Sequence, residues 1–385
     1  MKPMEGNPFD FSPEMFSKVP LFAELAKAMS WSGGPINWDL AKQIASAMAS
    51  ADHVAPIIDS DRDDLRDAAR LAEAWLSESA GFPAPPAVTR VMDLTPSQWV
   101  DRAVASFPEL LNPLGGKLTG ALAGDAESAE KNPLAGVMGQ LMPLLLGVQV
   151  GSVLGSLSSS LLTGYDVALP LEEDGILPIL VPHVDTHARL FALDRRDVRY
   201  WVTLHATAHR MLYEAFPWTR THFWSLYHSY LAAIDVNLGE TTERLQSLDI
   251  SRPEELQSAV GENLFGLGDS GFAGPALDRL HVLLGLLEAA AGLAVSAAAG
   301  GRLLGAGEIA ASVARARTDN DGVRSLERFI GLEVPALVEQ RAVSFCGATL
   351  DAGGWVLLNQ LWQDPQHLPT AEEFANPAAW IARVG

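Results

Sequence analysis

LDRRDVRYWVTLHATAHRMLYEAF, residues 193–216, is the stretch that decides the fold of this 385-residue chain. It contains neither glycine nor proline, and Asp194 stands where its side chain can cap the first turn of a helix. The pattern therefore predicts one long helix with two histidines on its apolar face. That face collects Val198, Trp201, Val202, His205, Ala208, His209 and Leu212.

The two histidines of this helix have the spacing of a zinc-binding pair. His205 and His209 are four residues apart, so their imidazoles project from the same face one turn apart, and a zinc site needs at least one further ligand. In the HExxH motif of zinc peptidases, a glutamate after the first histidine takes the proton from the attacking water. Here that position holds Ala206, which can do no proton chemistry.

Glu288 is the predicted third ligand. It is the only charged residue between His281 and Arg302, in an otherwise apolar stretch where an unpaired buried carboxylate would be costly. A metal ion or the histidine pair would offset that cost. A solvated groove or a distant arginine would offset the cost of burying Glu288 equally well. Glu288 is therefore either a metal ligand or a solvated or arginine-paired carboxylate.

The histidine pair also has an interpretation without metal. The imidazoles would pack against aromatic neighbours such as Trp201 and Trp218, with their ring nitrogens bonded to side chains or water. A bare HxxxH pair on an arbitrary helix favours this packing, and the presence of Glu288 shifts the balance toward a metal site.

Other polar residues are alternative ligands or substitute bases. Glu214 lies five residues after His209, about half a turn away from the face of the pair. His222 and His228 lie on the following helix and approach the pair only if that helix folds back. Glu172 and Glu173 lie in a proline-interrupted stretch that we expect beside the histidine helix.

Composition excludes several classes of function. The chain has 27 Lys and Arg against 47 Asp and Glu, and this formal charge of −20 repels nucleic acid. No GxSxG elbow, P-loop or dinucleotide-binding GxGxxG occurs. The single cysteine, Cys346, cannot form an internal disulfide, and the N-terminus lacks the pattern of a secretory signal, so we expect a cytoplasmic protein.

One apolar segment raises the question of a membrane. No charged residue occurs between Lys131 and Asp166, about 20 apolar residues can span a bilayer, and the glycines at 147, 151 and 155 form a GxxxG repeat. A proline, glutamines and serines interrupt the run, and no aromatic belt surrounds it. We therefore expect a buried central helix with close helix contacts, with a membrane-anchored structural protein as the alternative.

The rest of the chain predicts a mainly α protein. Residues 1–35 show no sustained period and predict an extended or mobile arm, and residues 36–385 predict one mostly helical domain. DVALPLEEDGILPILVPHV, residues 166–184, breaks the helical period and predicts a strand or hairpin, a small β edge beside the histidine helix. Further helices are predicted within residues 37–49, 61–76, 96–111, 217–236 and 277–301.

LHATAHRMLYEAFPW, residues 204–218, resembles a family of actinobacterial zincin-like metallopeptidases, often named only as hydrolases. In that family an HExxH or near variant is followed by an aromatic residue and then by a PW dipeptide. The resemblance extends from about residue 36 over most of the chain. It includes PINWDLAKQIA, GVQVGSVLG followed by DVALPL, LLGLLEAAAG, FIGLEV and the C-terminal LWQDPQHLPTAEEFANPAAWIARV.

The resemblance implies a zincin-like helical fold with zinc as cofactor. His205 and His209 match the paired zinc ligands of the family, and Glu288 matches the third ligand. Two departures distinguish this chain: Ala206 replaces the glutamate of HExxH, and alanines follow Glu288 where active-looking relatives carry polar residues. This chain therefore resembles a degenerate member of the family.

Two hypotheses about function follow. The first is a zincin-like protein impaired or inactive as a peptidase, with or without bound zinc, acting as a binding or regulatory module for an unknown protein or peptide partner. The second is an active zinc hydrolase in which another carboxylate, Glu214, Glu172 or Glu173, orients the water. The first is favoured because a general base contributes about 10²–10⁴-fold to the rate.

Overall fold

The computed structural model describes residues 33–50, 56–123, 133–234 and 274–385. The arm predicted over residues 1–35 lies almost wholly outside the described residues. Within them the protein is mainly helical, with one two-stranded sheet, as the sequence predicts.

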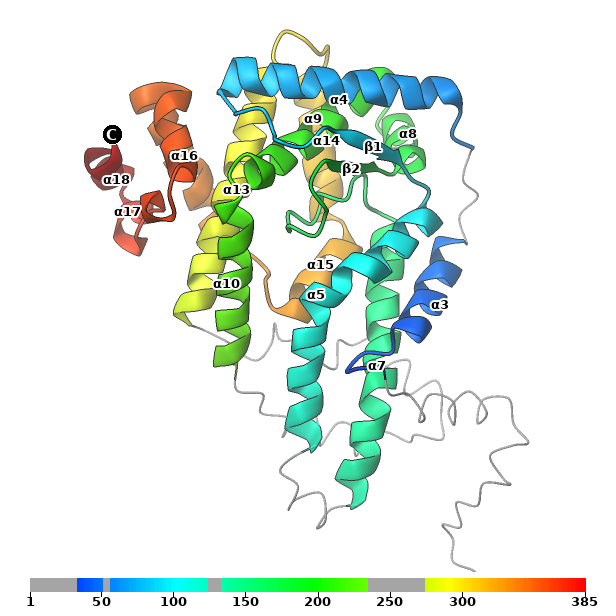
Figure 1. Cartoon of the computed structure of the whole chain (residues 1–385). Coiled ribbons are helices and arrows are strands. Elements are labelled where there is room, and N and C mark those ends of the chain that lie inside the picture. The colour runs from blue at the N-terminus through cyan, green and yellow to red at the C-terminus, as the bar shows by residue number, and fades with distance from the viewer. Residues whose placement is uncertain (1–32, 51–55, 124–132, 235–273) are drawn as a thin grey trace, which may run out of the picture.

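The histidine helix lies at the centre of the helices that surround the candidate site. It is α9 (Arg195–Glu214), and it packs against α4 (Asp59–Ala80), α8 (Val181–Leu190) and α13 (Pro275–Ala299). Figure 1 shows α4 lying across one end of the molecule, with α13 running away from it. Helices from three regions of the sequence therefore enclose α9.

The start of α9 follows from its capping residue. The Asp194 side chain accepts hydrogen bonds from the backbone N–H groups of Arg196 and Asp197, at 2.9 and 3.0 Å, which satisfies two donors of the first turn. This confirms the predicted N-cap. From Val198 to Glu214 every residue is buried, although the sequence pattern indicates only one apolar face. The charged residues of α9 must therefore find partners inside the protein.

Those partners come mainly from α4 and α8. Arg199 is 2% exposed and pairs with Asp61 at 2.8 Å and with Asp185 at 2.9 Å. Arg210 is fully buried and pairs with Glu73 of α4. Ion pairs thus fix α9 against α4 on both sides of the histidines.

The predicted β edge is a parallel pair of short strands. β2 (Ile176–Ile179) lies beside α9 and pairs with β1 (Arg90–Asp93), with Arg90 opposite Ile176. The strand prediction is therefore confirmed, and the partner comes from a distant part of the chain instead of from a hairpin. Gly175 precedes β2 at φ +79°, and a Cβ there would lie 2.8 Å from the Val88 carbonyl oxygen.

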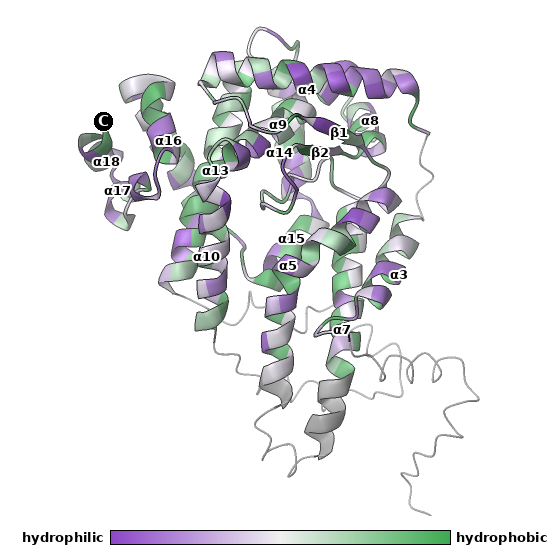
Figure 2. Ribbon diagram, viewed as in Figure 1, coloured by the Kyte–Doolittle hydropathy of each residue, from purple (hydrophilic) through white to green (hydrophobic). Residues whose placement is uncertain are grey.

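The glycine-rich segment forms α7 (Pro133–Ser158), which packs against α3 (Trp38–Ala49). A Cβ at Gly147 would lie 2.7 Å from the Asn37 carbonyl oxygen, and one at Gly151 would lie 2.8 Å from that of Ala41. The glycines therefore permit the close helix contact that the sequence predicts. In Figure 2, hydrophobic residues are prominent along α7 and α13, whereas α4 carries many hydrophilic ones.

In the described part of the chain, two helical segments are long and apolar enough to cross a membrane, Leu141–Ser158 and Pro275–Ala299. In each segment 67% of the residues are buried, and the two helices pack against α3, α4, α9 and other helices. Their apolar composition is thus used in packing between helices.

The remaining helices pack around α9 and α13 or extend from them along the chain. α14 contacts both α9 and α13, and so brings its own side chains to the candidate site. The bounds are α5 (Pro96–Ala123), α10 (Trp218–Ala233), α14 (Ala306–Thr318), α15 (Asp321–Ile330), α16 (Ala336–Leu358), the 3₁₀ turns η2 (Asn359–Trp362) and η3 (Pro365–His367), α17 (Ala371–Ala375) and α18 (Pro377–Val384).

Candidate metal centre

Helices α9 and α13 bring three side chains to one point. A ligand atom of His205, one of His209 and one of Glu288 all lie within 4.8 Å of one another. His209 Nε2 is 3.2 Å from Glu288 Oε2, and His205 Nε2 is 3.8 Å from Glu288 Oε1. Among the described residues this is the only such group of three or more histidine, cysteine or acidic side chains.

Whether a metal ion fits this site depends on the hydrogen bonds and spacing of the candidate ligand atoms. His209 is fully buried, its Nδ1 has no hydrogen-bond partner in the described part of the chain, and its Nε2 has only Glu288 Oε2, at 3.2 Å. Buried polar atoms are rarely left so. Zinc bonds of about 2.0–2.2 Å arranged tetrahedrally place neighbouring ligand atoms about 3.3–3.6 Å apart. In this structure Glu288 lies 3.2 Å from His209 and 3.8 Å from His205. The donor set therefore fits zinc.

One ring nitrogen of His209 lacks the hydrogen bond that usually orients a metal-binding histidine. A metal-bound histidine usually donates its other ring N–H to a carboxylate, a carbonyl or water. His209 Nδ1 has no such partner among the described residues. The orientation of this ring therefore depends on the packing of α9.

The protonation states suit a metal. Burial lowers the pKa of His209, so its imidazole is neutral at pH 7. Burial alone would raise the pKa of Glu288, but the guanidinium of Arg317 and the two histidines outweigh it and hold this pKa well below its ordinary value. Neutral imidazole and ionised carboxylate are the forms that bind zinc.

Arg317 is a fourth member of the site, and the sequence reasoning did not name it. It lies in the last turn of α14, and its Nη1 donates a hydrogen bond to Glu288 Oε1. The distant arginine considered as a partner for Glu288 is therefore present. It binds one carboxylate oxygen while the other faces His209, so the arginine and a metal do not compete for the same atom.

Aromatic packing accounts for only part of the histidine environment. Trp201 stacks on His205 with ring centroids 5.3 Å apart and planes inclined by 12°. Trp218 instead lies against His222 and donates its indole N–H to the Trp362 carbonyl oxygen. Of the two tryptophans expected beside the pair, Trp201 is the one that stacks on it.

The alternative candidates lie elsewhere. Glu214 accepts a hydrogen bond from the backbone N–H of Gly175 at 2.7 Å and pairs with Arg210 at 3.5 Å. It therefore holds the start of β2 against α9. Burial raises the pKa of Glu214, whose hydrogen bond and ion pair are with Gly175 and Arg210 and not with the triad.

The other expected substitutes are separate from the triad too. Glu172 is buried and pairs with Arg102 at 2.6 Å, while Glu173 is exposed. His222 and His228 lie on α10, where His228 is exposed, and neither belongs to the ligand group formed by the described residues. Ala206 is fully buried, between the two histidines on α9.

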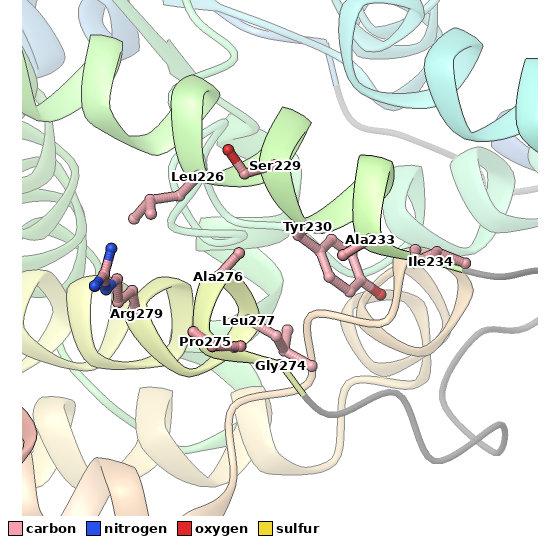
Figure 3. A pocket seen from close by; sticks show the side chains of 10 residues that line it. All are labelled: Leu226, Ser229, Tyr230, Ala233, Ile234, Gly274, Pro275, Ala276, Leu277 and Arg279. Carbon is pink, nitrogen blue, oxygen red and sulfur yellow. The ribbon is translucent and has the colours of Figure 1, made fainter.

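Two hollows of the described structure lie away from the triad. One of about 310 Å³ lies between α10 and the first turns of α13, whose side chains face each other across it (Figure 3). Another of about 420 Å³ lies between the starts of α9 and α14. Neither is lined by a triad residue. The side chain of Glu288 is 34% exposed, although its Oε2 is buried.

Comparison with known proteins agrees with this geometry. The sequence profile of the family described as zincin-like metallopeptidase matches residues 36–381. The chain belongs to the zincin-like metallopeptidase family. The resemblance found in the sequence is thereby confirmed at the level of the family. In this zincin-like protein Ala206 is the residue that directly follows His205.

A solved structure supports the fold. The crystal structure of a hydrolase candidate with a novel fold from Chloroflexus aurantiacus is 24% identical, with a TM-score of 0.65. The match covers 90% of this chain and 98% of that one, and at this identity it shows the fold alone. The comparison with curated proteins finds no match.

A second carboxylate near Arg317 gives a pH-dependent stability. Burial raises the pKa of Glu327 on α15 to about 7, with Arg317 opposing this shift and the carboxylates of Glu333, Glu339 and Glu288 adding to it. Between about pH 4.5 and 7 this group is ionised in the unfolded chain and still protonated in the folded one. Stability is therefore lost as the pH rises through this window.

Replacing Glu327 by glutamine is expected to raise the free energy of unfolding by about 1–3 kcal/mol at pH 8. Below pH 4.5 the difference from the wild type should vanish, because both forms are then neutral. Urea unfolding at pH 4.5 and pH 8 measures this, with the exposed Glu372→Gln as control. An equal effect of Glu327→Gln at the two pH values would contradict the assignment.

Proposed function

We propose that this chain is a zinc-binding zincin-like protein that has lost peptidase activity and acts as a binding or regulatory module for a protein or peptide. The supporting observation is the triad His205, His209 and Glu288 with Ala206 between its histidines. The ligands are present, and the group that moves the proton is missing.

The absence of a glutamate after His205 favours this function over an active hydrolase. A general base contributes about 10²–10⁴-fold to the rate. The carboxylates that would replace it have other partners: Glu214 holds Gly175 and Arg210, and Glu172 holds Arg102. Glu173 is exposed. A water molecule at the centre therefore has no base among the carboxylates that the sequence suggested.

The remaining residues support binding. His205, His209 and Glu288 would hold zinc, which supplies a Lewis acid that polarises an oxygen ligand. Arg317 keeps the Glu288 carboxylate ionised and fixes one of its oxygens. Trp201 limits the motion of the His205 ring by stacking on it. These groups bind and orient a ligand without moving a proton.

Zinc titration tests the proposal. The wild-type chain, purified without chelators, is expected to bind about one zinc ion per chain, and His209→Ala to weaken binding by at least about 100-fold. Zinc at about 100 times its Kd should raise the free energy of unfolding by about 2.7 kcal/mol. Elemental analysis, calorimetric titration and thermal unfolding with and without zinc measure these effects.

The matched control is His228→Ala, which changes an exposed histidine on α10 and should leave zinc binding unchanged. Zinc binding equal in His209→Ala and wild type would place the metal elsewhere and contradict the proposal. So would cleavage of a peptide library by the wild type at a rate that a chelator abolishes, because the chain would then be a working peptidase.

A further inference from the structure

The charge of this centre differs from that of an HExxH centre in two places. Ala206 replaces the glutamate, and Arg317 adds a guanidinium beside the third ligand. With zinc, two neutral histidines, one carboxylate and one guanidinium, the centre has a net charge of about +2, whereas an HExxH centre with two carboxylates is about neutral. At short range such an excess strongly favours a negatively charged ligand.

The guanidinium of Arg317 also has N–H donors that make no hydrogen bond among the described residues. A guanidinium carries five N–H donors, and in the described part of the chain the side chain of Arg317 makes one hydrogen bond, from Nη1 to Glu288 Oε1. The Arg317 side chain is 31% exposed, so part of it contacts solvent. The planar fork of an arginine matches two oxygens of a carboxylate or phosphate.

Nearby acids leave this guanidinium accessible. Asp166 and Glu327 act electrostatically on Arg317, but in the described structure Glu288 is the only carboxylate that pairs with it. Asp166 Oδ2 accepts hydrogen bonds from the backbone N–H groups of Leu162 and Thr163, and its Oδ1 accepts one from the Thr163 hydroxyl. These acids therefore leave the remaining N–H donors of Arg317 without a carboxylate partner in the described part of the chain.

We infer that the metal-loaded centre binds an oxyanion, a carboxylate or phosphate group held jointly by the metal and Arg317. This inference rests on the proposed function, because it requires the metal. It names the chemistry of the ligand: the recognised group of a partner carries the oxyanion, as an acidic side chain, a chain terminus or a phosphorylated residue does. A neutral peptide carbonyl gains less from the same charges.

Cobalt substitution tests the inference without measuring activity. The full chain is loaded with Co²⁺, whose visible absorption reports on its ligands, and is titrated at constant ionic strength with acetate, inorganic phosphate or neutral acetamide. Saturable changes are expected with acetate or phosphate, and the stronger of the two identifies the preferred oxyanion. Acetamide should give no comparable change. Arg317→Gln should weaken oxyanion binding by about 10–100-fold, because it removes charge-assisted hydrogen bonds.

Two further variants keep the result interpretable. Arg317→Lys retains the charge but not the fork and should give an intermediate affinity. Ala206→Glu leaves Arg317 and Glu288 unchanged, adds one negative charge, and should also weaken oxyanion binding. If Arg317→Gln no longer binds cobalt, the oxyanion affinity of Ala206→Glu tests the inference instead.

The outcomes separate the two proposals. A wild-type chain that binds no Co²⁺ contradicts the proposed function and this inference together. A chain that binds Co²⁺ but responds equally to acetate and acetamide overturns only the inference. Oxyanion affinity that is unchanged in both Arg317→Gln and Ala206→Glu overturns it as well.

Discussion

Ala206→Glu is expected to raise the zinc-dependent peptide hydrolysis of this chain by about 10²–10⁴-fold, the usual contribution of a general base. The substitution recreates the HExxH spacing on α9, where the ligands already lie within 4.8 Å of one another. The new carboxylate would follow His205 directly, the position from which the family takes a proton from water. The measurement is cleavage of a peptide library by zinc-loaded wild type and variant, with and without chelator.

Ala206→Gln is the matched control for this gain. It has nearly the same size and shape as glutamate but cannot accept the proton, so its rate should stay at the wild-type level. Because Ala206 is fully buried, both variants are expected to lose some stability, and thermal unfolding of each shows whether the fold persists. Equal rates for folded Ala206→Glu and Ala206→Gln would show that more than the base is missing.

The sequence could predict those parts of the site that depend on local order. The spacing of His205 and His209 is a property of one helix, and the Asp194 cap lies beside the turn that it closes. Glu288 could be predicted to lie beside the histidines because a lone charge in an apolar helix needs a partner. These three inferences require no knowledge of how distant segments pack.

The partner of Glu288 was beyond the reach of this reasoning. The segment from Arg315 to Arg317 offers two arginines at the end of α14, and nothing local shows which of them turns toward α13. The choice is made by the packing of α14 against α9 and α13. The partner in an ion pair between distant segments therefore depends on tertiary packing. The sequence shows only that the charge of Glu288 needs a partner.

The same limit explains the sheet and the buried charges. β2 was predicted from its prolines and apolar residues, but its partner β1 is only four residues long and lies in a distant segment. The apolar face of α9 was predicted correctly, whereas the burial of Arg199 and Arg210 depends on acids that α4 and α8 supply.

Arg199→Leu is expected to lower the free energy of unfolding by about 3–5 kcal/mol, the cost of breaking a buried ion pair by removing one partner. The Arg199 guanidinium is 2% exposed and bonds to Asp61 and Asp185, whose side chains are 6% and 20% exposed. After the substitution, Asp61 is left with Arg195, which is 52% exposed. Urea unfolding of wild type and variant at pH 7 measures the loss.

The pH dependence distinguishes this ion pair from loss of packing alone. Burial would raise the pKa of Asp185, but Arg195 and Arg199 outweigh it and lower this pKa below its ordinary value of 3.8. A lowered pKa contributes stability above pH 3.8 that is lost as the pH falls through the folded-state pKa. The difference between Arg199→Leu and wild type should therefore shrink below pH 3.8. Arg195→Leu, at an exposed site, should cost about 1 kcal/mol or less at pH 7. If both substitutions cost the same, the burial of Arg199 would not be the source of its effect.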